Sequence, residues 1–150
     1  MLYATMNSPV GELLLVGDET ALRGLHFPNH RHPLKHDYRS AREPFAAARE
    51  QLEQYFAGER REFDLPLHAT GDPVQQRVWR LIAAIPYGRT ATYGELARAL
   101  GDGTTAQEVG AAVGSNPLSI LVGCHRVLGS GGKLTGYAGG LGRKRRLLEL

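Results

Sequence analysis

Two matching helix-start signals separated by a short turn constrain the fold of this chain more than any other feature. Thr92 and Glu95 form the first and Thr105 and Glu108 the second, each with the spacing of a capping box. Gly101, between them, is the residue type that ends helices in a left-handed conformation. The segment is therefore predicted to fold as two short helices joined by a tight turn, a helix-turn-helix.

The first half of the chain is predicted to mix strands and a helix. Apolar runs around residues 13–16, 22–27 and 63–67 are typical of strands, and residues 44–57 carry the apolar spacing of a helix. We therefore expect an α+β N-terminal lobe over residues 1–70.

The second half is predicted to be mostly helical. Asp72 is placed to cap a helix that begins at Pro73 and stops before Pro86. Residues 118–122 are predicted to form a buried strand. These elements and the helix-turn-helix define an expected C-terminal domain over residues 71–150.

Charge and composition exclude some classes of protein and leave one surface open to two interpretations. No run of about 18 apolar residues is available to span a membrane, and no signal peptide is evident. We therefore expect a cytoplasmic protein with no membrane partner. The basic run 143–146 either contacts DNA phosphates or forms a solvated helix face. His30, His32 and His36 are predicted to lie in a surface loop, and no metal site is predicted.

The second helix of the predicted helix-turn-helix has an unusually slim face. Gln107, Ala111 and Gly114 share this face at helical spacing. Small residues there allow close approach either to a narrow minor groove or to a neighbouring helix. The pattern alone leaves these two interpretations open.

Cys124 is the only cysteine, so an intramolecular disulfide is excluded and the thiol is either a core residue or a reactive group. His125 follows it directly and is placed to remove the thiol proton, directly or through water. Arg126 either lowers the cost of negative charge or ties neighbouring segments together. The glycine-rich stretch that follows lacks the spacing of a phosphate-binding loop.

Several motifs resemble those of the O6-alkylguanine-DNA alkyltransferase family, also called methylated-DNA–protein-cysteine methyltransferases. The motifs occur in family order and at family spacing, at residues 93–97, 109–112, 116–117, 124–127 and 136–141. The resemblance implies an RNase-H-like fold for the N-terminal lobe and a winged or helix-turn-helix DNA-binding motif in the C-terminal lobe.

The resemblance also implies a role for individual residues. Cys124 is similar to the alkyl acceptor, and His125 to the residue that takes its proton through a bound water. Tyr93 resembles the tyrosine that helps rotate the damaged nucleotide out of the duplex and donates a proton toward guanine N3. Asn116 resembles an asparagine hinge that braces the helix against the active-site segment.

Two further groups of residues are assigned by the same resemblance. The expected pocket residues are Gly123, Val127, Tyr137 and Ala138, where Tyr137 forms a wall and the Ala138 amide donates to guanine O6. The expected DNA-contacting residues are Tyr93, Gly94, Gln107, Ala111 and Ser130.

The chain departs from the family pattern at four positions. Gln107 replaces an arginine that fills the gap left by the flipped base, so we expect weaker DNA binding or slower flipping. Gly123 replaces a proline, which is expected to make the backbone before Cys124 less rigid. A glutamate that completes the cysteine–histidine pair would fall at position 151, so either the sequence is truncated or His125 lacks its orienting carboxylate. Ser119 replaces a proline found in some relatives.

The predicted function is direct-reversal DNA repair. The chain is expected to transfer an alkyl group irreversibly, once per molecule, from O6-alkylguanine in double-stranded DNA to Cys124, with O4-alkylthymine as a second substrate. It is expected to act as a monomer without a cofactor. Two alternatives are a damage sensor that flips alkylated guanine without transfer and a helix-turn-helix regulator with a structural cysteine.

Overall fold

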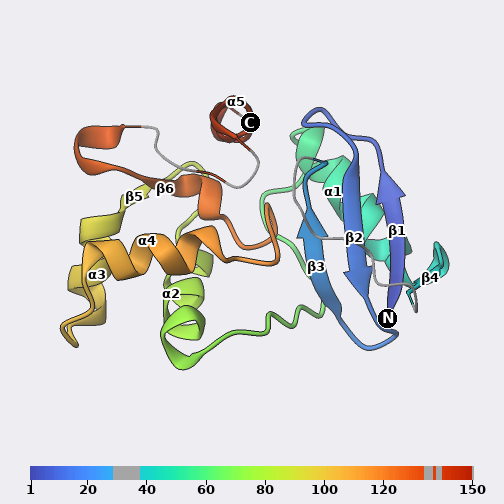
Figure 1. Cartoon of the computed structure of the whole chain (residues 1–150). Helices are drawn as coiled ribbons and strands as arrows, with labels where there is room; N and C mark the ends of the chain where they lie inside the picture. Colours follow the sequence, from blue (N-terminus) through green and yellow to red (C-terminus); the bar gives the residue numbers. More distant parts are fainter. Residues whose placement is uncertain (29–37, 134–136, 138–139, 150) are drawn as a thin grey trace.

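The computed structural model describes residues 1–28, 38–133, 137 and 140–149, which form two lobes side by side (Figure 1). One lobe contains the N-terminal sheet and the first α-helix, and the other contains the later α-helices. This arrangement confirms the predicted α+β class. The predicted histidine loop lies almost entirely outside the described residues.

Four strands form the N-terminal sheet. They are β1 (Leu2–Met6), β2 (Leu13–Gly17), β3 (Leu22–His26) and β4 (Arg39–Ser40), in the order β3-β2-β1-β4. β2 pairs antiparallel with both of its neighbours, whereas β4 runs parallel to β1. The turn from β1 to β2 includes Gly11 with φ 104°, a conformation that favours glycine.

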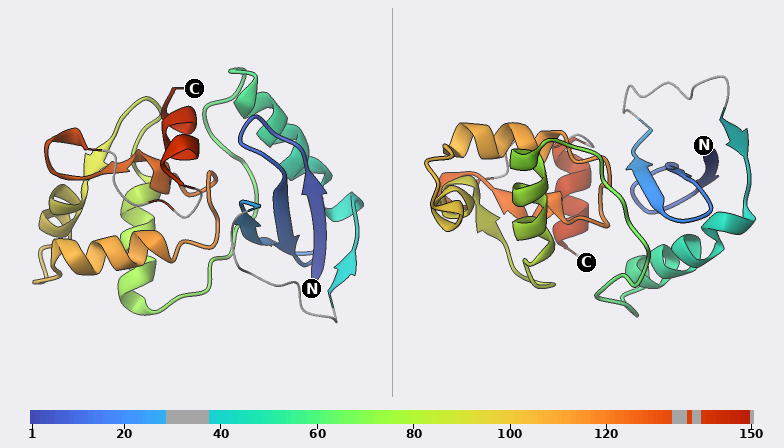
Figure 2. Two further views of the ribbon diagram at one scale, coloured as in Figure 1. Left: turned by 45° about the horizontal axis from the view of Figure 1, so that its top comes forward. Right: turned by 90° about the horizontal axis from the view of Figure 1, so that it is seen from below.

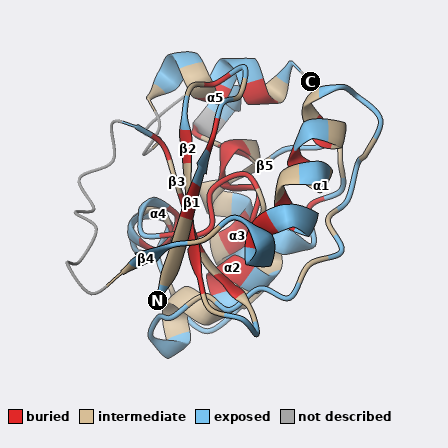
Figure 3. Ribbon diagram, turned by 90° about the vertical axis from the view of Figure 1, so that its right-hand side faces the viewer, coloured by how far each residue is buried: buried red, intermediate tan, exposed pale blue. Residues whose placement is uncertain are grey.

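The 3-10 helix η1 (Glu43–Phe45) leads into α1 (Ala46–Phe56), which packs beside the sheet (Figure 3). The buried side of this helical segment follows the predicted apolar spacing and consists of Phe45, Ala48, Leu52 and Tyr55. These side chains share one core with the buried strand residues Leu13, Leu15 and Leu25.

The helical lobe contains α2 (Pro73–Ala83), α3 (Tyr93–Leu100), α4 (Ala106–Gly114) and α5 (Leu141–Leu148). Both predicted capping boxes are confirmed, with the Glu95 and Glu108 amides each donating to the preceding threonine hydroxyl at 3.1 Å. Gly101 ends α3 with φ 65°, as predicted. The helix-turn-helix of α3 and α4 is therefore confirmed. The Trp79 indole N–H on α2 donates to the Ala112 carbonyl on α4 at 2.8 Å.

Short segments connect α4 to the C-terminal helix. The 3-10 helix η2 (Cys124–Arg126) runs into β6 (Val127–Leu128), which is followed by the 3-10 helix η3 (Ser130–Gly132). β6 pairs parallel with β5 (Ala91–Thr92), the segment that leads directly into α3. This pairing brings the start of α3 beside the turn that contains Cys124. Figure 2 shows α5 along the side of the helical lobe that faces the sheet.

Two predicted strands are wrong. Residues 118–122 form a turn in which Ile120 has φ 71°, and only Leu118 makes an isolated bridge, to Leu25. Residues 63–67 also make a single bridge, from Leu67 to Leu22. Leu118, Ile120 and Val122 are apolar because they are buried, not because they pair in a sheet. Neither segment has a partner strand along its length, so neither forms a ladder. None of the helices in the described part of the chain is long and apolar enough to cross a membrane.

Candidate active site

The Cys124 thiol is held at the end of α4 by one side chain. Asn116 donates from Nδ2 to the sulfur at 2.8 Å and to the Val122 carbonyl at 3.0 Å. Its Oδ1 accepts the Leu118 amide at 2.9 Å, and the thiol lies 3.5 Å from the Val113 carbonyl. Asn116 thus fixes the position of the sulfur relative to the helix-turn-helix. It also provides hydrogen-bond partners for two backbone groups of the turn between α4 and Cys124.

A cavity of about 300 Å³ opens beside this sulfur. Its polar wall is formed by Tyr93, Asn116, Ser119, Cys124 and Tyr137, and its remaining wall by Gly110, Val113 and Gly114. This volume lies at the lower end of the range for small-molecule pockets, about 300–1,000 Å³. The buried thiol therefore faces a hollow suited to one flat ring system rather than solid core packing.

Small residues on α4 make this hollow. A Cβ atom on Gly110 would lie 3.9 Å from the Tyr93 ring, in ordinary contact. Any longer side chain at that position would project into the space between α3 and α4. Gly114, which belongs to the slim face predicted for α4, also lines the cavity.

The surroundings of Cys124 have opposing effects on its ionisation. Burial raises the pKa of the thiol to about 12, whereas the Asn116 hydrogen bond and the positive charge of Lys144 lower it. Tyr137 is affected in the same direction, because burial and the neighbouring Cys124 and Tyr55 hold the pKa of its hydroxyl well above its usual value. The buried Tyr137 hydroxyl has no hydrogen-bond partner within the described residues, so it is a neutral donor available to a ligand.

His125 is almost completely buried next to the cysteine, with 1% of its surface exposed. Burial and the charges of Arg126 and Lys144 lower the pKa of His125 to about 3. The imidazole is therefore neutral at neutral pH, and its surroundings disfavour the protonated ring. Its Nδ1 atom has no hydrogen-bond partner among the residues that the structure describes.

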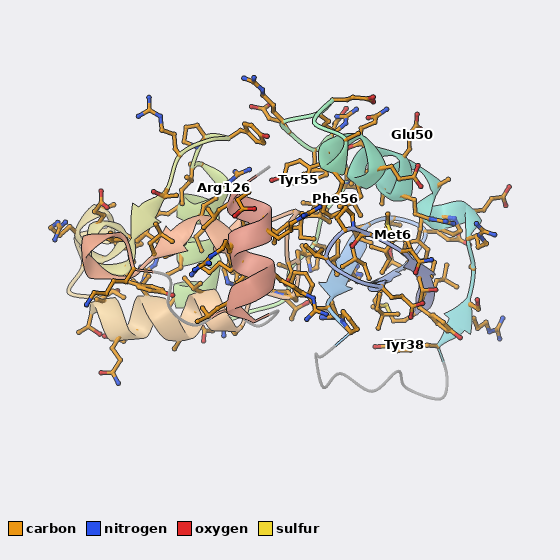
Figure 4. All side chains as sticks on the ribbon, turned by 90° about the horizontal axis from the view of Figure 1, so that it is seen from above. Met6, Tyr38, Glu50, Tyr55, Phe56 and Arg126 are labelled. Carbon is orange, nitrogen blue, oxygen red and sulfur yellow. The ribbon has the colours of Figure 1, made fainter. Side chains whose placement is uncertain are left out.

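Arg126 ties the cysteine turn to two other parts of the molecule. Its guanidinium donates to the Ile85 carbonyl at 3.0 Å and lies 3.5 Å from the Tyr55 hydroxyl on α1. It also stacks over the Tyr87 ring, 5.8 Å from the ring centroid. Figure 4 shows Arg126 and Tyr55 facing one another where the two lobes meet. Of the two roles open for Arg126, the tying role is present in the structure.

The predicted DNA-contacting residues lie on three elements of the helical lobe, α3, α4 and η3. Gln107, Ala111 and Gly114 are exposed on α4, as the spacing predicts, while Gly94 lies in the first turn of α3. Ser130 begins η3. The outward position of the three α4 residues favours the groove interpretation over a helix–helix contact.

The structure does not bring every predicted pocket residue to the cavity. Gly123 and Val127 are buried and do not line it. Gly123 precedes η2, and Val127 begins β6. Ala138 lies outside the described residues. A Cβ atom on Gly123 would lie 3.2 Å from Arg126 Cδ, so the glycine leaves room for that side chain.

Lys144 is the residue near the sulfur that the sequence did not single out. It lies in the basic run 143–146, where Arg145 and Arg146 are exposed but Lys144 is fully buried. The helix that carries it, α5, packs against the cysteine turn. The sequence pattern does not identify Lys144 because it does not show which face of α5 is buried.

Comparison with known proteins gives consistent matches over the whole chain. Residues 1–69 match the family model of the 6-O-methylguanine DNA methyltransferase ribonuclease-like domain, and residues 73–150 match that of the DNA-binding domain. The methylated-DNA–protein-cysteine methyltransferase of Mycolicibacterium paratuberculosis is 47% identical over 99% of this chain and 90% of its own length. That of Methanosarcina acetivorans is 44% identical over 100% of this chain and 97% of its own. The crystal structure of Mycobacterium tuberculosis OGT in complex with DNA superimposes with a TM-score of 0.94 at 45% identity, covering 99% of this chain and 91% of that one.

Proposed function

The chain belongs to the 6-O-methylguanine DNA methyltransferase family, and from this premise we propose that Cys124 is the residue that receives the alkyl group. The protein is a methylated-DNA–protein-cysteine methyltransferase with a ribonuclease-like sheet domain and a helical DNA-binding domain, and it acts in direct-reversal repair of DNA. The observation that carries the assignment of Cys124 is the 300 Å³ cavity that opens directly onto its sulfur.

The proposed reaction is a displacement at the alkyl carbon of O6-alkylguanine. The sulfur forms a bond to this carbon while the carbon–O6 bond breaks and its electron pair goes to the guanine. His125 takes the proton from the thiol, and Tyr93 supplies one to the departing guanine, so the overall proton count is unchanged. No step needs a cofactor. A thioether is a poor leaving group, so each molecule acts once.

The cavity residues divide the remaining work. Asn116 holds the sulfur in place through its 2.8 Å contact. Tyr137 lines the cavity with a neutral hydroxyl, which suits hydrogen bonding to a base edge. Tyr93 lies at the start of α3, and we propose that it contacts the backbone of the rotated nucleotide. The target atom is inaccessible in stacked DNA, so extrusion of the base precedes transfer, at a cost of a few kcal/mol.

The protein binds DNA, and the proposed ligand is a duplex that contains O6-alkylguanine. The exposed α4 face of Gln107, Ala111 and Gly114 is proposed to enter the minor groove, with Gly94 and Ser130 beside the backbone. We propose that the protein acts as a monomer, because the cavity beside Cys124 is complete without a second copy of the chain. We place the domain boundary at residues 70 and 71, in the connection between α1 and α2.

Mass spectrometry of the reacted protein tests the assignment of Cys124. The protein is incubated with a duplex oligonucleotide that contains O6-methylguanine, and the tryptic peptide with Cys124 is weighed. We expect that peptide to gain one methylene group, and no gain in Cys124→Ser or with an undamaged duplex. Methylation of another residue, or tight lesion binding without any mass gain, would contradict the proposal.

A further inference from the structure

The helix-turn-helix carries little positive charge for an element that meets DNA. Between residues 92 and 116, Arg98 is the only lysine or arginine. Position 107 on the exposed face of α4 holds an uncharged glutamine. Attraction to the phosphates supplies the non-specific affinity of proteins for DNA, so binding by this element depends on where its one cation lies.

Arg98 lies on the same face of α3 as Gly94. The two residues are four positions apart, which places them one above the other along the helix. Arg98 is exposed, whereas the buried residue of α3 is Leu96. Gly94 is proposed above to lie beside the DNA backbone, so Arg98 extends that surface by one helical turn.

The Arg98 side chain reaches back along α3 to its first turn. A Cβ atom on Gly94 would lie 3.6 Å from Arg98 Nη1, so the guanidinium lies beside the Gly94 backbone. This direction follows from helix geometry, because side chains tilt toward the N-terminus of their helix. Since position 94 has no side chain, that residue does not cover the guanidinium.

The charge of Arg98 is not used by the rest of the described structure. Its side chain makes no ion pair or hydrogen bond with the residues that the structure describes. Glu95 and Glu108 direct their carboxylates to the two capping boxes. Asp102, the remaining acidic residue of the segment, pairs with Arg77 at 2.9 Å.

The position of α3 in the molecule leaves this face accessible. Figures 1 and 2 show α3 at the end of the helical lobe that is farthest from the sheet lobe, with α5 and the C-terminus on another side. The guanidinium is therefore available to a ligand that approaches the start of α3.

From these observations we propose that Arg98 is a DNA-contacting residue whose guanidinium binds a backbone phosphate beside Gly94. It supplies on α3 the positive charge that α4 lacks at Gln107. The inference rests on the proposed function, because it takes the Gly94 side of α3 as the side that meets the lesion-containing duplex. A guanidinium can bind phosphate oxygens through two parallel N–H donors, so an uncovered arginine suits this partner.

The salt dependence of binding tests the contact. The affinity of the full chain for a duplex with O6-methylguanine is measured by fluorescence anisotropy at several sodium chloride concentrations. We expect Arg98→Gln to bind severalfold more weakly at low salt. Its slope of log affinity against log salt is expected to be shallower by about 0.9, the value for one lost phosphate contact. Arg98→Lys keeps the charge and is expected to keep most of the slope.

Arg42→Gln is the matched control, because it removes an exposed arginine from the sheet lobe, and it is expected to retain the unmodified slope. Iodoacetamide is expected to alkylate Cys124 equally fast in all variants, since Arg98 does not line the cavity beside the sulfur. Arg98 also lies in the last turn of α3, where a positive charge stabilises a helix. A lower melting temperature in Arg98→Gln with the slope of the control would overturn the proposal in favour of that structural role.

Uncharged phosphate analogues locate the contact on the DNA. Phosphates near the lesion are replaced one at a time by methylphosphonate, and binding of the unmodified protein and of Arg98→Gln is compared. We expect one position at which the replacement weakens binding of the unmodified protein severalfold but leaves Arg98→Gln unaffected. Equal losses in both proteins at every position would show that Arg98 contacts no phosphate.

Single-turnover transfer separates this inference from the proposed function. We expect Arg98→Gln to need a higher concentration of the O6-methylguanine duplex for half-maximal transfer, with the maximal rate unchanged. Normal methylation of Cys124 with an unchanged salt slope in Arg98→Gln would overturn the Arg98 contact and leave the proposed function standing. The expected change of slope without methylation of Cys124 would keep the contact and remove the proposed acceptor.

Discussion

At the scale of single residues, the ionisation of Cys124 depends on effects of opposite sign. Burial favours the neutral thiol, while the Asn116 amide and the Lys144 ammonium favour the thiolate. The pKa of the thiol is raised to about 12 and that of His125 is lowered to about 3, so the proton stays on sulfur in the resting protein. Formation of the nucleophile therefore depends on the groups that stabilise negative charge at the sulfur.

Lys144→Met is expected to make the thiol less reactive. The lysine charge lowers the pKa of Cys124, so its removal raises that pKa and reduces the thiolate fraction at any pH below it. Each unit of pKa corresponds to a tenfold change in thiolate, and we expect a loss on the order of tenfold in the rate of iodoacetamide alkylation. The rate, measured against pH, is expected to shift to higher pH.

Methionine suits this test because it is long, unbranched and apolar, so it fills the buried position of the lysine. Lys144→Arg keeps the charge and is expected to recover much of the alkylation rate. An unchanged pH profile in Lys144→Met, with the fold intact by circular dichroism, would show that the lysine charge does not act on the sulfur.

At the scale of elements, α4 combines two surfaces in nine residues. Its buried side holds Val109, Ala112 and Val113, and its exposed side holds Gln107 and Ala111. The cap at Thr105 fixes where the helix begins and therefore where its exposed face is presented. Glutamine at position 107 supplies a hydrogen-bonding side chain to this face without a charge.

Gln107→Arg is expected to strengthen DNA binding. One additional phosphate contact steepens the dependence of log affinity on log salt concentration by about 0.9. Fluorescence anisotropy with lesion-containing and undamaged duplexes at several salt concentrations measures this slope, and single-turnover transfer is expected to accelerate with it. Ala46→Arg adds the same charge to an exposed position on α1 and is the control, with little change expected. Equal slopes in all three proteins would remove position 107 from the DNA interface.

At the scale of the whole molecule, side chains from the helical lobe hold the sheet lobe against it. The Arg143 Nε atom on α5 donates to the Val10 carbonyl at 2.6 Å, and its guanidinium lies over the Phe27 ring at 5.8 Å. Arg126 makes the corresponding contact to Tyr55 on α1. The basic run 143–146 is therefore neither one DNA-facing patch nor one solvated face, because its members point to different surroundings.

Arg143→Met is expected to lower the melting temperature because it removes a contact between the lobes. Hydrogen bonds that involve a charged group contribute about 1.5–3 kcal/mol, so a loss of this order in the free energy of unfolding is expected. Arg145→Met removes a charge from the exposed side of the same helix and is expected to change stability by less than about 0.5 kcal/mol. Chemical denaturation of both variants measures the difference. Equal stabilities would show that the Val10 contact contributes nothing.

The sequence by itself determined the features that depend on residues close together in the chain. The caps of α2, α3 and α4 and the left-handed Gly101 all involve positions within four residues of one another, so local geometry was sufficient. The family motifs added the expected roles of Tyr93 and Asn116. In the structure, both residues line the same cavity as Cys124.

Only the tertiary structure decided the features that depend on distant partners. Residues 118–122 are apolar because they are buried, and whether a buried segment pairs as a strand depends on a neighbour that periodicity does not identify. Lys144 lies twenty positions after Cys124, and its charge acts there only because α5 packs on the cysteine turn. The cavity beside Cys124 likewise combines residues of α3, α4 and the cysteine turn, because a hydrophobic pattern indicates which face is buried but not what packs against it.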